Sequence, residues 1–329
     1  MYTEQSHTQH DCKPFVSFII PTYNVPTSLI KDCLESIVSL SLRPSEREII
    51  IVDDGSKESP IGDLEEYVDD IIFIRQKNQG PSAARNMGLK MATGQYVQFV
   101  DSDDRLITPV YEHCLDLVRF QKPEMVVFDF TRKARRQVLF NDGEVRTGVD
   151  YMTKCNIHGS PCCYIFSRNI IGGLRFLEGI VHEDEDFNPR LLLKAKSVIV
   201  TDAKAYLYNS RINSIMGSRT QEATSKRLND KMFVIERLRD LALHSPQEES
   251  TALSRRVAQL TMDYIYQTIV DTKSRMELDR RLEDLKEKGL FPLPEREYTS
   301  KYKWFRRMTN SEMGRTVLLH TLPLMSRER

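Results

Sequence analysis

The stretch GQYVQFVDSDD, residues 94–104, decides the fold and concentrates acidic charge. Its apolar run over residues 96–100 predicts a buried strand, and the turn that follows carries three carboxylates, Asp101, Asp103 and Asp104. Carboxylates this close repel one another and resist burial, so solvent or a cation must neutralise them. Oxygen ligands of this kind suit Mg²⁺ or Mn²⁺, which bind through one or two carboxylates plus substrate phosphates. The alternative is an acidic surface turn that caps the next helix through Asp104 or Thr108.

The composition indicates a globular chain without a strong overall charge. The 329 residues include 47 basic and 47 acidic side chains, so no global field favours nucleic acid, and 40% apolar residues can form a sizeable core. The six cysteines form no CxxC pair, which favours a reducing compartment. Residues 1–14 are polar and show no secretory signal, and no segment is apolar enough to span a bilayer. We therefore expect a cytoplasmic protein with a loosely attached or disordered N-terminus.

Strand and helix patterns alternate through the first part of the chain. Strands are predicted over residues 15–20, 48–52, 71–74 and 96–100, and helical spacing marks residues 29–38 and 81–91. This alternation predicts an α/β fold with a mostly parallel sheet flanked by helices. The four strands end in the polar turns PTYN, DDGS, NQGPSAARN and DSDD. Because parallel sheets bind ligands beyond the carboxyl ends of their strands, we expect these turns to meet in one crevice.

The second part of the chain is less regular. After a helix ending near Arg119, strands are predicted over residues 125–130, 162–167, 198–200 and 205–208, with a helix over 181–193. Residues 132–148 predict a hairpin that turns at residues 141–143, and the basic run that starts at Arg132 is typical of a solvated face. Three helical patterns follow from about residue 220. The domain prediction is therefore a catalytic domain over 15–218, with halves 15–104 and 105–218, a helical extension over 219–300 and a tail over 301–329.

The tail is basic, aromatic and amphipathic. Residues 301–329 hold seven basic and two acidic residues, with Trp304 and Phe305 among the basic ones. Such an end can lie on an anionic membrane surface. Alternatively, its leucines dock on the globular body: Leu318, Leu319, Leu322 and Leu324.

Two common nucleotide-binding motifs are absent. Neither GxGxxG nor GxxxxGK[ST] follows the first strand, which argues against a dinucleotide-binding dehydrogenase and a P-loop NTPase. The predicted sheet edge instead offers an aromatic ring, carboxylates and an arginine. These groups suit a nucleotide diphosphate, because the ring and a carboxylate can bind base and ribose while a cation and an arginine neutralise the pyrophosphate.

Four segments in order, VSFIIPTYNV, EIIIVDDGS, NQGPSAARNMGL and GQYVQFVDSDD, make residues 16–104 similar to one known family. They resemble the nucleotide-binding half of an inverting family 2 glycosyltransferase with the GT-A fold. The likeness continues more weakly to about Met216 through FLEGIVHEDEDF and AYLYNSRINSI. The helical remainder carries no motif of the family.

The resemblance implies a donor-binding role for six residues. Tyr23 resembles the residue that stacks on the base, Asp54 the one that hydrogen-bonds it, and Pro21 lends backbone contacts. Arg85 resembles the residue near the diphosphate. In the DSDD segment, Asp101 resembles the ribose-side or water-mediated member and Asp103 the direct ligand of Mn²⁺ or Mg²⁺. Two alternatives stay open, since Tyr23 could be a core residue and Arg85 could pair with Asp53.

The resemblance also implies the catalytic base. Within HEDEDF, Asp184 matches the base, followed three positions later by the aromatic Phe187, and the rival carboxylates are Glu183, Glu185 and Asp186. His182 and Arg211 are candidate phosphate or supporting contacts, and His182 could equally be a structural histidine.

The expected function is transfer of a sugar, with inversion, from a nucleotide-sugar to an acceptor hydroxyl. The family implies a UDP-sugar donor and a saccharide or lipid-linked acceptor in polysaccharide or glycoconjugate synthesis. One alternative is a sugar-phosphate nucleotidyltransferase, whose glycine-rich basic loop should follow the first strand; PTYNVPTS lacks both features. A second alternative is a non-catalytic sugar-nucleotide-binding subunit.

Overall fold

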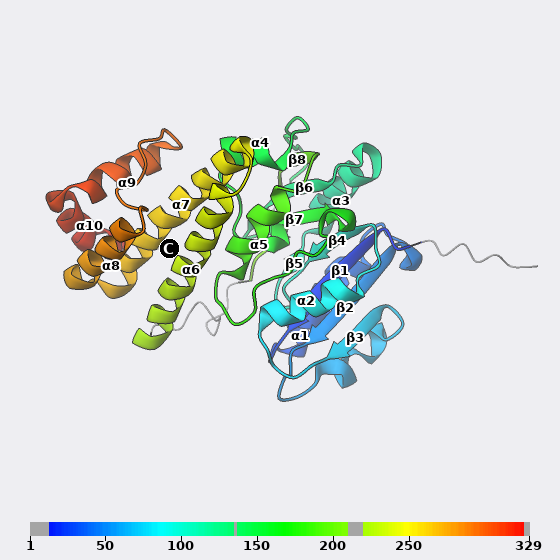
Figure 1. Cartoon of the computed structure of the whole chain (residues 1–329). Coiled ribbons are helices and arrows are strands. Elements are labelled where there is room, and N and C mark those ends of the chain that lie inside the picture. The colour runs from blue at the N-terminus through cyan, green and yellow to red at the C-terminus, as the bar shows by residue number, and fades with distance from the viewer. Residues whose placement is uncertain (1–12, 135–136, 210–219, 326–329) are drawn as a thin grey trace, which may run out of the picture. The chain divides into compact units, whose positions relative to one another are not determined.

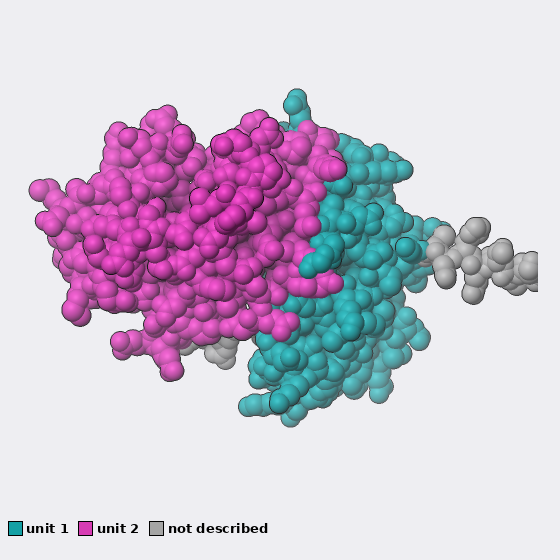
Figure 2. Space-filling model, viewed as in Figure 1, with its two compact units in different colours: residues 1–144, 162–173, 199–209 teal, residues 145–161, 174–198, 210–329 magenta. Residues whose placement is uncertain are grey.

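The computed structural model describes residues 13–134, 137–209 and 220–325, which form two compact units (Figures 1 and 2). The sheet unit contains the chain up to residue 144 together with residues 162–173 and 199–209. The helical unit contains residues 145–161, 174–198 and those from 210 onward. Each unit therefore combines segments that are separated in the sequence.

The sheet unit is built on an eight-stranded sheet in the order β3-β2-β1-β4-β7-β6-β8-β5. Its strands are β1 (Val16–Thr22), β2 (Arg47–Asp53), β3 (Ile71–Arg75), β4 (Tyr96–Phe99), β5 (Arg105–Leu106), β6 (Met125–Thr131), β7 (Tyr164–Ser167) and β8 (Val198–Leu207), whose first residue lies in the helical unit. Its helices are α1 (Thr27–Val38), α2 (Pro81–Met91) and α3 (Thr108–Asp116). The predicted strands and helices of residues 15–100 are therefore confirmed.

The parallel part of the sheet is the part that the sequence marks most clearly. Strands β3, β2, β1 and β4 all run parallel, whereas β7 pairs antiparallel with β4 and β6, and β5 pairs antiparallel with β8. The apolar residues of β1 and β2 are fully buried, as expected for strands covered on both faces, and α2 packs on both strands. The sheet is thus mixed, and its parallel half aligns the carboxyl ends of four strands at one edge.

The predicted hairpin over residues 132–148 is not found in the part of this segment that the structure describes, residues 132–134 and 137–148. Asp142 and Arg146 form isolated antiparallel bridges with Thr201 and Val198, so this part of the segment pairs along β8. Asn-Asp-Gly favours a turn but does not specify the partner of the flanking residues, which here comes from 52 to 59 residues further along the chain. The two short strands predicted over residues 198–208 are one continuous strand, β8.

The helical unit contains the remaining helices. They are α4 (Gly148–Lys154), α5 (Glu183–Leu192), α6 (Gln221–Leu243), α7 (Gln247–Thr272), α8 (Arg275–Glu287), α9 (Ser300–Asn310) and α10 (Glu312–Met325). Hydroxyl side chains cap the first turns of α4, α6, α8 and α9, where Thr147, Thr220, Ser274 and Thr299 each accept a hydrogen bond from a backbone N–H. The three predicted helices between about 220 and 287 are confirmed.

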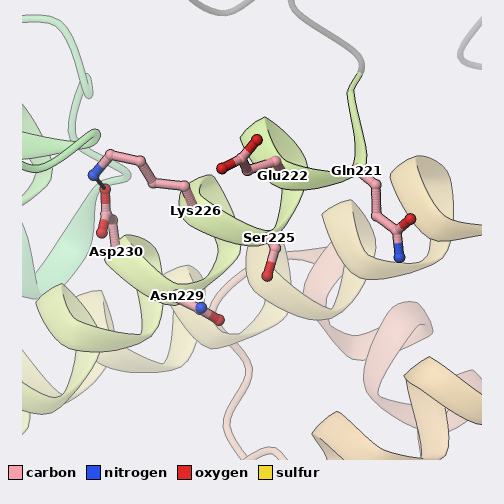
Figure 3. Close-up of a pocket in the computed structure, with 6 residues that line it drawn as sticks. All are labelled: Gln221, Glu222, Ser225, Lys226, Asn229 and Asp230. Carbon is pink, nitrogen blue, oxygen red and sulfur yellow. Dashed lines mark hydrogen bonds and ion pairs between the residues drawn. The ribbon is translucent and has the colours of Figure 1, made fainter.

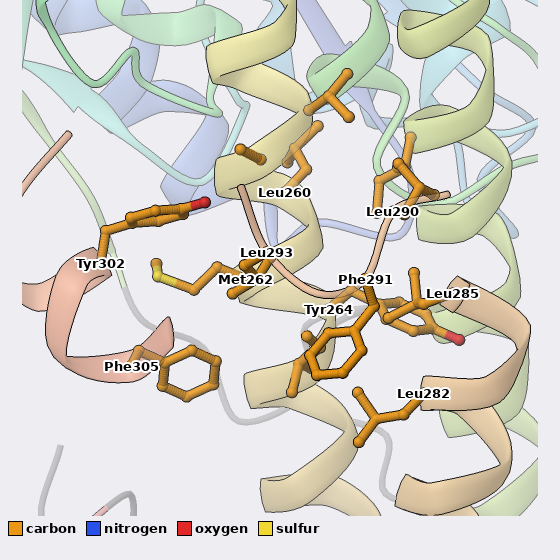
Figure 4. Close-up of a cluster of buried hydrophobic side chains, with 14 of the residues drawn as sticks. Leu260, Met262, Tyr264, Leu282, Leu285, Leu290, Phe291, Leu293, Tyr302 and Phe305 are labelled. Atoms are coloured by element: carbon orange, nitrogen blue, oxygen red, sulfur yellow. The ribbon is translucent and has the colours of Figure 1, made fainter. Parts of the chain in front are cut away.

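One apolar cluster holds α6 to α10 together (Figure 4). Tyr264 of α7, Leu285 of α8 and Phe305 of α9 are among its buried members, and Leu318 and Leu322 of α10 join them. The docking of the tail leucines is therefore observed for these two residues and in part for Leu319, which packs against the cluster, whereas Leu324 is 64% exposed. In the described ranges, no helix combines the length and apolar character needed to cross a bilayer.

Candidate active site

The turns after β1 and β2 are joined by hydrogen bonds at the carboxyl edge of the sheet. The backbone N–H of Asn24 donates to Oγ of Ser56 over 2.9 Å, and the N–H of Lys57 donates to Oδ1 of Asn24 over 2.9 Å. Tyr23, which precedes Asn24, is 48% exposed, so the alternative that it is a core residue is wrong. Pro21 lies within β1 opposite Val52 of β2.

Asp54 fastens the turn after β2 to the turn after β3. Its buried carboxylate accepts hydrogen bonds from Nε2 of Gln76 at 2.7 Å, from the N–H of Gln79 at 2.9 Å and from the N–H of Gly80 at 2.8 Å. Both carboxylate oxygens are engaged, and two of the three donors are backbone N–H groups. Asp54 therefore organises the loop that leads into α2, a role that the sequence did not reveal.

Gly55 allows the same two turns to approach closely. Its φ of +76° lies in the left-handed region, and a Cβ atom there would meet the backbone nitrogen of Asn78 at 2.7 Å. Only glycine satisfies both conditions without displacing the neighbouring chain. The close approach of the two turns and the left-handed φ therefore explain the glycine in DDGS.

Arg85 of α2 joins the turn after β3 to the turn after β4. Its guanidinium forms an ion pair with Asp101, with Nη2 2.9 Å from Oδ1, and its side chain is only 8% exposed. The alternative pairing of Arg85 with Asp53 is not observed, because Asp53 faces Arg75 at 3.4 Å instead. The pair places a guanidinium and a carboxylate side by side at the sheet edge. The four predicted turns are thus linked in sequence along one edge.

Asp104 is held by hydrogen bonds that the sequence did not reveal. It accepts hydrogen bonds from the Tyr206 hydroxyl at 2.8 Å and from the N–H of Asn209 at 2.7 Å, and the same hydroxyl accepts from the N–H of Asp101. Burial, together with the charge of Asp101, raises the pKa of Asp104 to about 7. Helix α3 begins after Ile107 without a side-chain cap, so the alternative of a capping acidic turn is wrong.

A pocket of about 300 Å³ opens beside Asp103. It is lined by Leu29, Asp32, Asp103, Arg105, Arg132, Ala134, Leu207, Tyr208 and Asn209. The guanidinium of Arg132 lies 5.8 Å from the ring centroid of Tyr208, at a distance typical of a cation–π contact. Arg132, assigned from sequence to a solvated face, is exposed but also lines this pocket.

The pocket fits a divalent cation only if another group completes the coordination. No group of three or more His, Cys, Asp or Glu side chains is arranged to hold a metal within the ranges that the structure describes. Mg²⁺ sites that act on phosphates commonly use one or two carboxylates and take their other ligands from water and the phosphates. Asp103, at the wall of a polar pocket, fits that second type of site.

The acidic segment at the start of α5 belongs to the helical unit, whereas the residues of the sheet edge belong to the sheet unit. Its four carboxylates, at residues 183–186, occupy the first turn of the helix. Glu185 is ion-paired with Arg256 of α7. Asp186 is ion-paired with both Arg190 and Arg237, at 3.2 Å in each of these two pairs. Asp184 accepts a hydrogen bond from the N–H of Glu185 at 2.9 Å. The structure thus commits two of the four candidate bases to buried ion pairs.

His182 precedes this turn in the left-handed conformation, with φ of +72°. Its side chain is 8% exposed, and its Nε2 atom has no hydrogen-bond partner. Burial, followed by the charge of Lys231, lowers the pKa of His182 to about 4. The imidazole is therefore neutral near pH 7. Arg211, the other predicted supporting residue, lies outside the described residues.

The chain is similar to proteins of known type in sequence and in structure. Residues 17–161 match the family described as Glycosyl transferase family 2. The uncharacterized glycosyltransferase EpsJ of Bacillus subtilis is 28% identical over 219 residues, a match that covers 61% of this chain and 63% of EpsJ. The chain thus spans less than two thirds of this relative.

The solved structures agree with this match at the level of the fold. S. aureus TarS 1–349 in complex with UDP-GlcNAc superposes with a TM-score of 0.64 at 19% identity, over 95% of this chain and 92% of that one. The mannosyltransferase PcManGT of Pyrobaculum calidifontis, in complex with GDP-Man and Mn²⁺, gives a TM-score of 0.55 at 14% identity, over 96% and 88%. The predicted α/β fold of the GT-A type, with C-terminal helices, is confirmed. Residues 17–161, a little under half of the chain, therefore match glycosyl transferase family 2, as the sequence motifs suggest.

Proposed function

We propose that the protein transfers a sugar, with inversion, from a nucleoside-diphosphate sugar to an acceptor hydroxyl in polysaccharide or glycoconjugate synthesis. The observation that carries this proposal is the linked sheet edge, where Asp54, the Arg85–Asp101 pair and the pocket beside Asp103 follow one another. The match to glycosyl transferase family 2 supports it, as do the nucleotide-sugars bound by two structural neighbours. A UDP-sugar is the donor that we test first.

The proposed donor contacts follow the chemistry of each side chain. Tyr23, exposed at the end of β1, offers a ring on which a base can stack, and Pro21 offers backbone contacts beside it. The side chain of Asp54 is occupied by the loop after β3, so its contribution to the base is to hold that loop in place. Arg85 and Asp101 would lie at the diphosphate and ribose, where the guanidinium can offset phosphate charge.

The leaving group determines the need for a cation. Cleavage of the anomeric bond leaves a nucleoside diphosphate with additional negative charge, and Asp103 is the residue that would hold Mn²⁺ or Mg²⁺ near it. A divalent ion bound there supplies Lewis-acid stabilisation of that charge. Asp103 itself fixes the position of the ion, and Arg85 adds a fixed positive charge on the protein.

The acceptor hydroxyl needs a base, since it is a poor nucleophile while protonated. We assign this role to Asp184, and Glu183 is the alternative within the same turn. Removal of the proton by a positioned carboxylate typically contributes about 10² to 10⁴ in rate. Attack from the face opposite to the leaving group inverts the anomeric configuration, which NMR of the product can determine.

The proposed compartment is the cytoplasm, with the tail as the place of any membrane contact. Five cysteines of the described residues are free thiols, which suits a reducing environment. Since Leu318 and Leu322 are buried in the helical unit, a contact with anionic lipid would use the exposed Trp304 and Val317 beside the basic Arg307.

Product analysis separates the proposal from its rivals. The purified chain is incubated with UDP-GlcNAc, UDP-glucose or GDP-mannose and Mn²⁺, with and without candidate saccharide acceptors. A glycosyltransferase releases the nucleoside diphosphate, by transfer or by slow hydrolysis. A nucleotidyltransferase instead exchanges pyrophosphate, and a non-catalytic subunit binds the nucleotide-sugar without releasing any product. Either of the last two results would contradict the proposed function.

A further inference from the structure

No helix or strand fixes the backbone conformation of the segment that leads into α5. Gly179 and His182 both have left-handed φ values, +79° and +72°, and the residues between them belong to neither a helix nor a strand. A carboxylate that serves as a base must be held within about 0.5 Å of its working position. The direction of the segment before Asp184 must therefore be set by groups outside it.

Two side chains of α6, those of Lys226 and Asp230, hold this segment by hydrogen bonds to its backbone. The backbone N–H of Val181 donates to Oδ2 of Asp230 over 2.8 Å, and Nζ of Lys226 donates to the carbonyl oxygen of Gly179 over 2.9 Å. Lys226 and Asp230 lie one helical turn apart and are also bonded to each other at 2.7 Å, as the dashed line in Figure 3 shows. The pair thus binds one N–H and one C=O of the incoming chain.

The same helix also binds Asp186, two residues after Asp184 in the chain. Six residues beyond Lys231, Nε of Arg237 donates to Oδ1 of Asp186 over 3.2 Å. Lys231 itself is 4% exposed and lies near Glu185, which is ion-paired with Arg256 of α7.

We propose that α6 is the positioning element for the base, and that Asp230 and Lys226 are positioning residues that act through the backbone of residues 179–181. This inference rests on the proposed function, because it assumes that Asp184 or its neighbour Glu183 removes the acceptor proton. It gives the C-terminal helices a role in the reaction although none of their side chains needs to touch substrate. A displacement of about 1 Å at a catalytic group can cost roughly 10²-fold in rate.

The test compares Asp230→Ala with Asp230→Asn in the full-length chain. The alanine variant removes the acceptor for the Val181 N–H, whereas asparagine keeps an oxygen there and loses only the ion pair with Lys226. We expect Asp230→Ala to lower kcat about 10-fold to 100-fold and to change the donor KM less than twofold. Asp230→Asn should recover most of that loss.

Asp240→Ala is the matched control. Asp240 lies on the same helix, its side chain is 61% exposed, and within the described part of the chain that side chain is bonded only to the adjacent Arg239. Its replacement should leave kcat unchanged. Equal losses in Asp230→Ala and Asp240→Ala would show a general effect on α6 and would contradict the positioning role.

Hydrogen exchange gives a second readout that does not depend on activity. Asp230→Ala should speed amide exchange in peptides that contain residues 179–186, with no change in peptides from the carboxyl end of α6. An unchanged kcat, or unchanged exchange in that segment, would overturn the inference. Failure of the wild-type chain to bind or cleave any nucleotide-sugar would instead overturn the proposed function, so the two failures can be distinguished.

Discussion

Single residues differ sharply within the acidic turn at the start of α5. Glu185 and Asp186 are held by arginines, and a carboxylate whose oxygens are committed to buried ion pairs cannot turn toward an acceptor without breaking them. Asp184, which matches the family motif, is our candidate for the base, and Glu183 is the alternative. The neighbouring His182 differs from these carboxylates, because burial lowers its pKa and keeps the imidazole neutral near pH 7.

We expect Asp184→Asn to reduce sugar transfer by about 10² to 10⁴, because the amide cannot accept the acceptor proton. Donor binding should remain within about twofold, since the carboxylate has no role before the acceptor arrives. Steady-state transfer and calorimetric donor binding check both statements, with Glu183→Gln as the matched variant. Normal turnover by Asp184→Asn combined with inactivity of Glu183→Gln would reassign the base.

His182 predicts a specific dependence of stability on pH. Its pKa of about 4 in the folded protein lies below the ordinary 6.5, so the folded state binds fewer protons between these values. The stability contributed by this residue is therefore complete above pH 6.5 and is lost as the pH falls toward 4. The loss is at most about 3 kcal/mol.

His182→Asn tests this dependence, because asparagine tolerates the left-handed conformation but does not titrate. Urea unfolding at pH 7.5 and 4.5 should show a larger loss of stability for the wild type than for the variant. Parallel losses in the two proteins would rule out His182 as the source.

At the scale of elements, the donor edge depends on loops that are tied to one another. Replacing Gly55 by alanine should destabilise the fold by about 1–3 kcal/mol, because Cβ meets the Asn78 backbone and the left-handed φ disfavours a side chain. Gly62→Ala is the matched control, since no atom lies within 4 Å of its Cβ position and its φ is not left-handed. Chemical denaturation compares the two, and a similar cost at both positions would contradict the steric argument.

The elements that the sequence predicts well are those with local signals. Continuous apolar runs bounded by polar turns located β1, β2 and β4, and small residues at helical spacing located α2. Strand order then placed Asp54, Arg85 and Asp101 at one edge without any knowledge of their contacts.

Elements that depend on distant partners could not be predicted in this way. The pairing of residues 142–146 with β8 and the contact between Tyr206 and Asp104 join positions that are far apart in the chain. The hydrogen bond between Asp230 of α6 and the backbone of Val181 also joins distant positions. Nothing in the sequence near Asp230 indicates Val181 as its partner. Arg132 was missed for a related reason, since a basic run on a surface has the same pattern whether or not it lines a pocket.

At the scale of the whole molecule, the tail is part of the helical core. Leu318 is fully buried, whereas Leu324 on the same helix is 64% exposed. We expect Leu318→Ala to lower the free energy of unfolding by about 2–5 kcal/mol through lost burial and a cavity. Leu324→Ala should change it by less than about 0.5 kcal/mol. Equal, small effects would indicate that α10 is not docked in solution.

The central claim is that the linked edge of the sheet unit binds a nucleoside-diphosphate sugar with the help of Asp103. Thermal unfolding in UDP-GlcNAc, with Mn²⁺ and with EDTA, tests it directly in the wild type, in Asp103→Asn and in Asp69→Asn, an exposed site of the same unit. A ligand at 100 times its Kd stabilises the folded state by about 2.7 kcal/mol. We expect a rise in Tm with Mn²⁺ for the wild type and for Asp69→Asn, and little or none for Asp103→Asn. If neither this donor nor GDP-mannose stabilises the wild type, or if Asp103→Asn responds like the wild type, the account is contradicted.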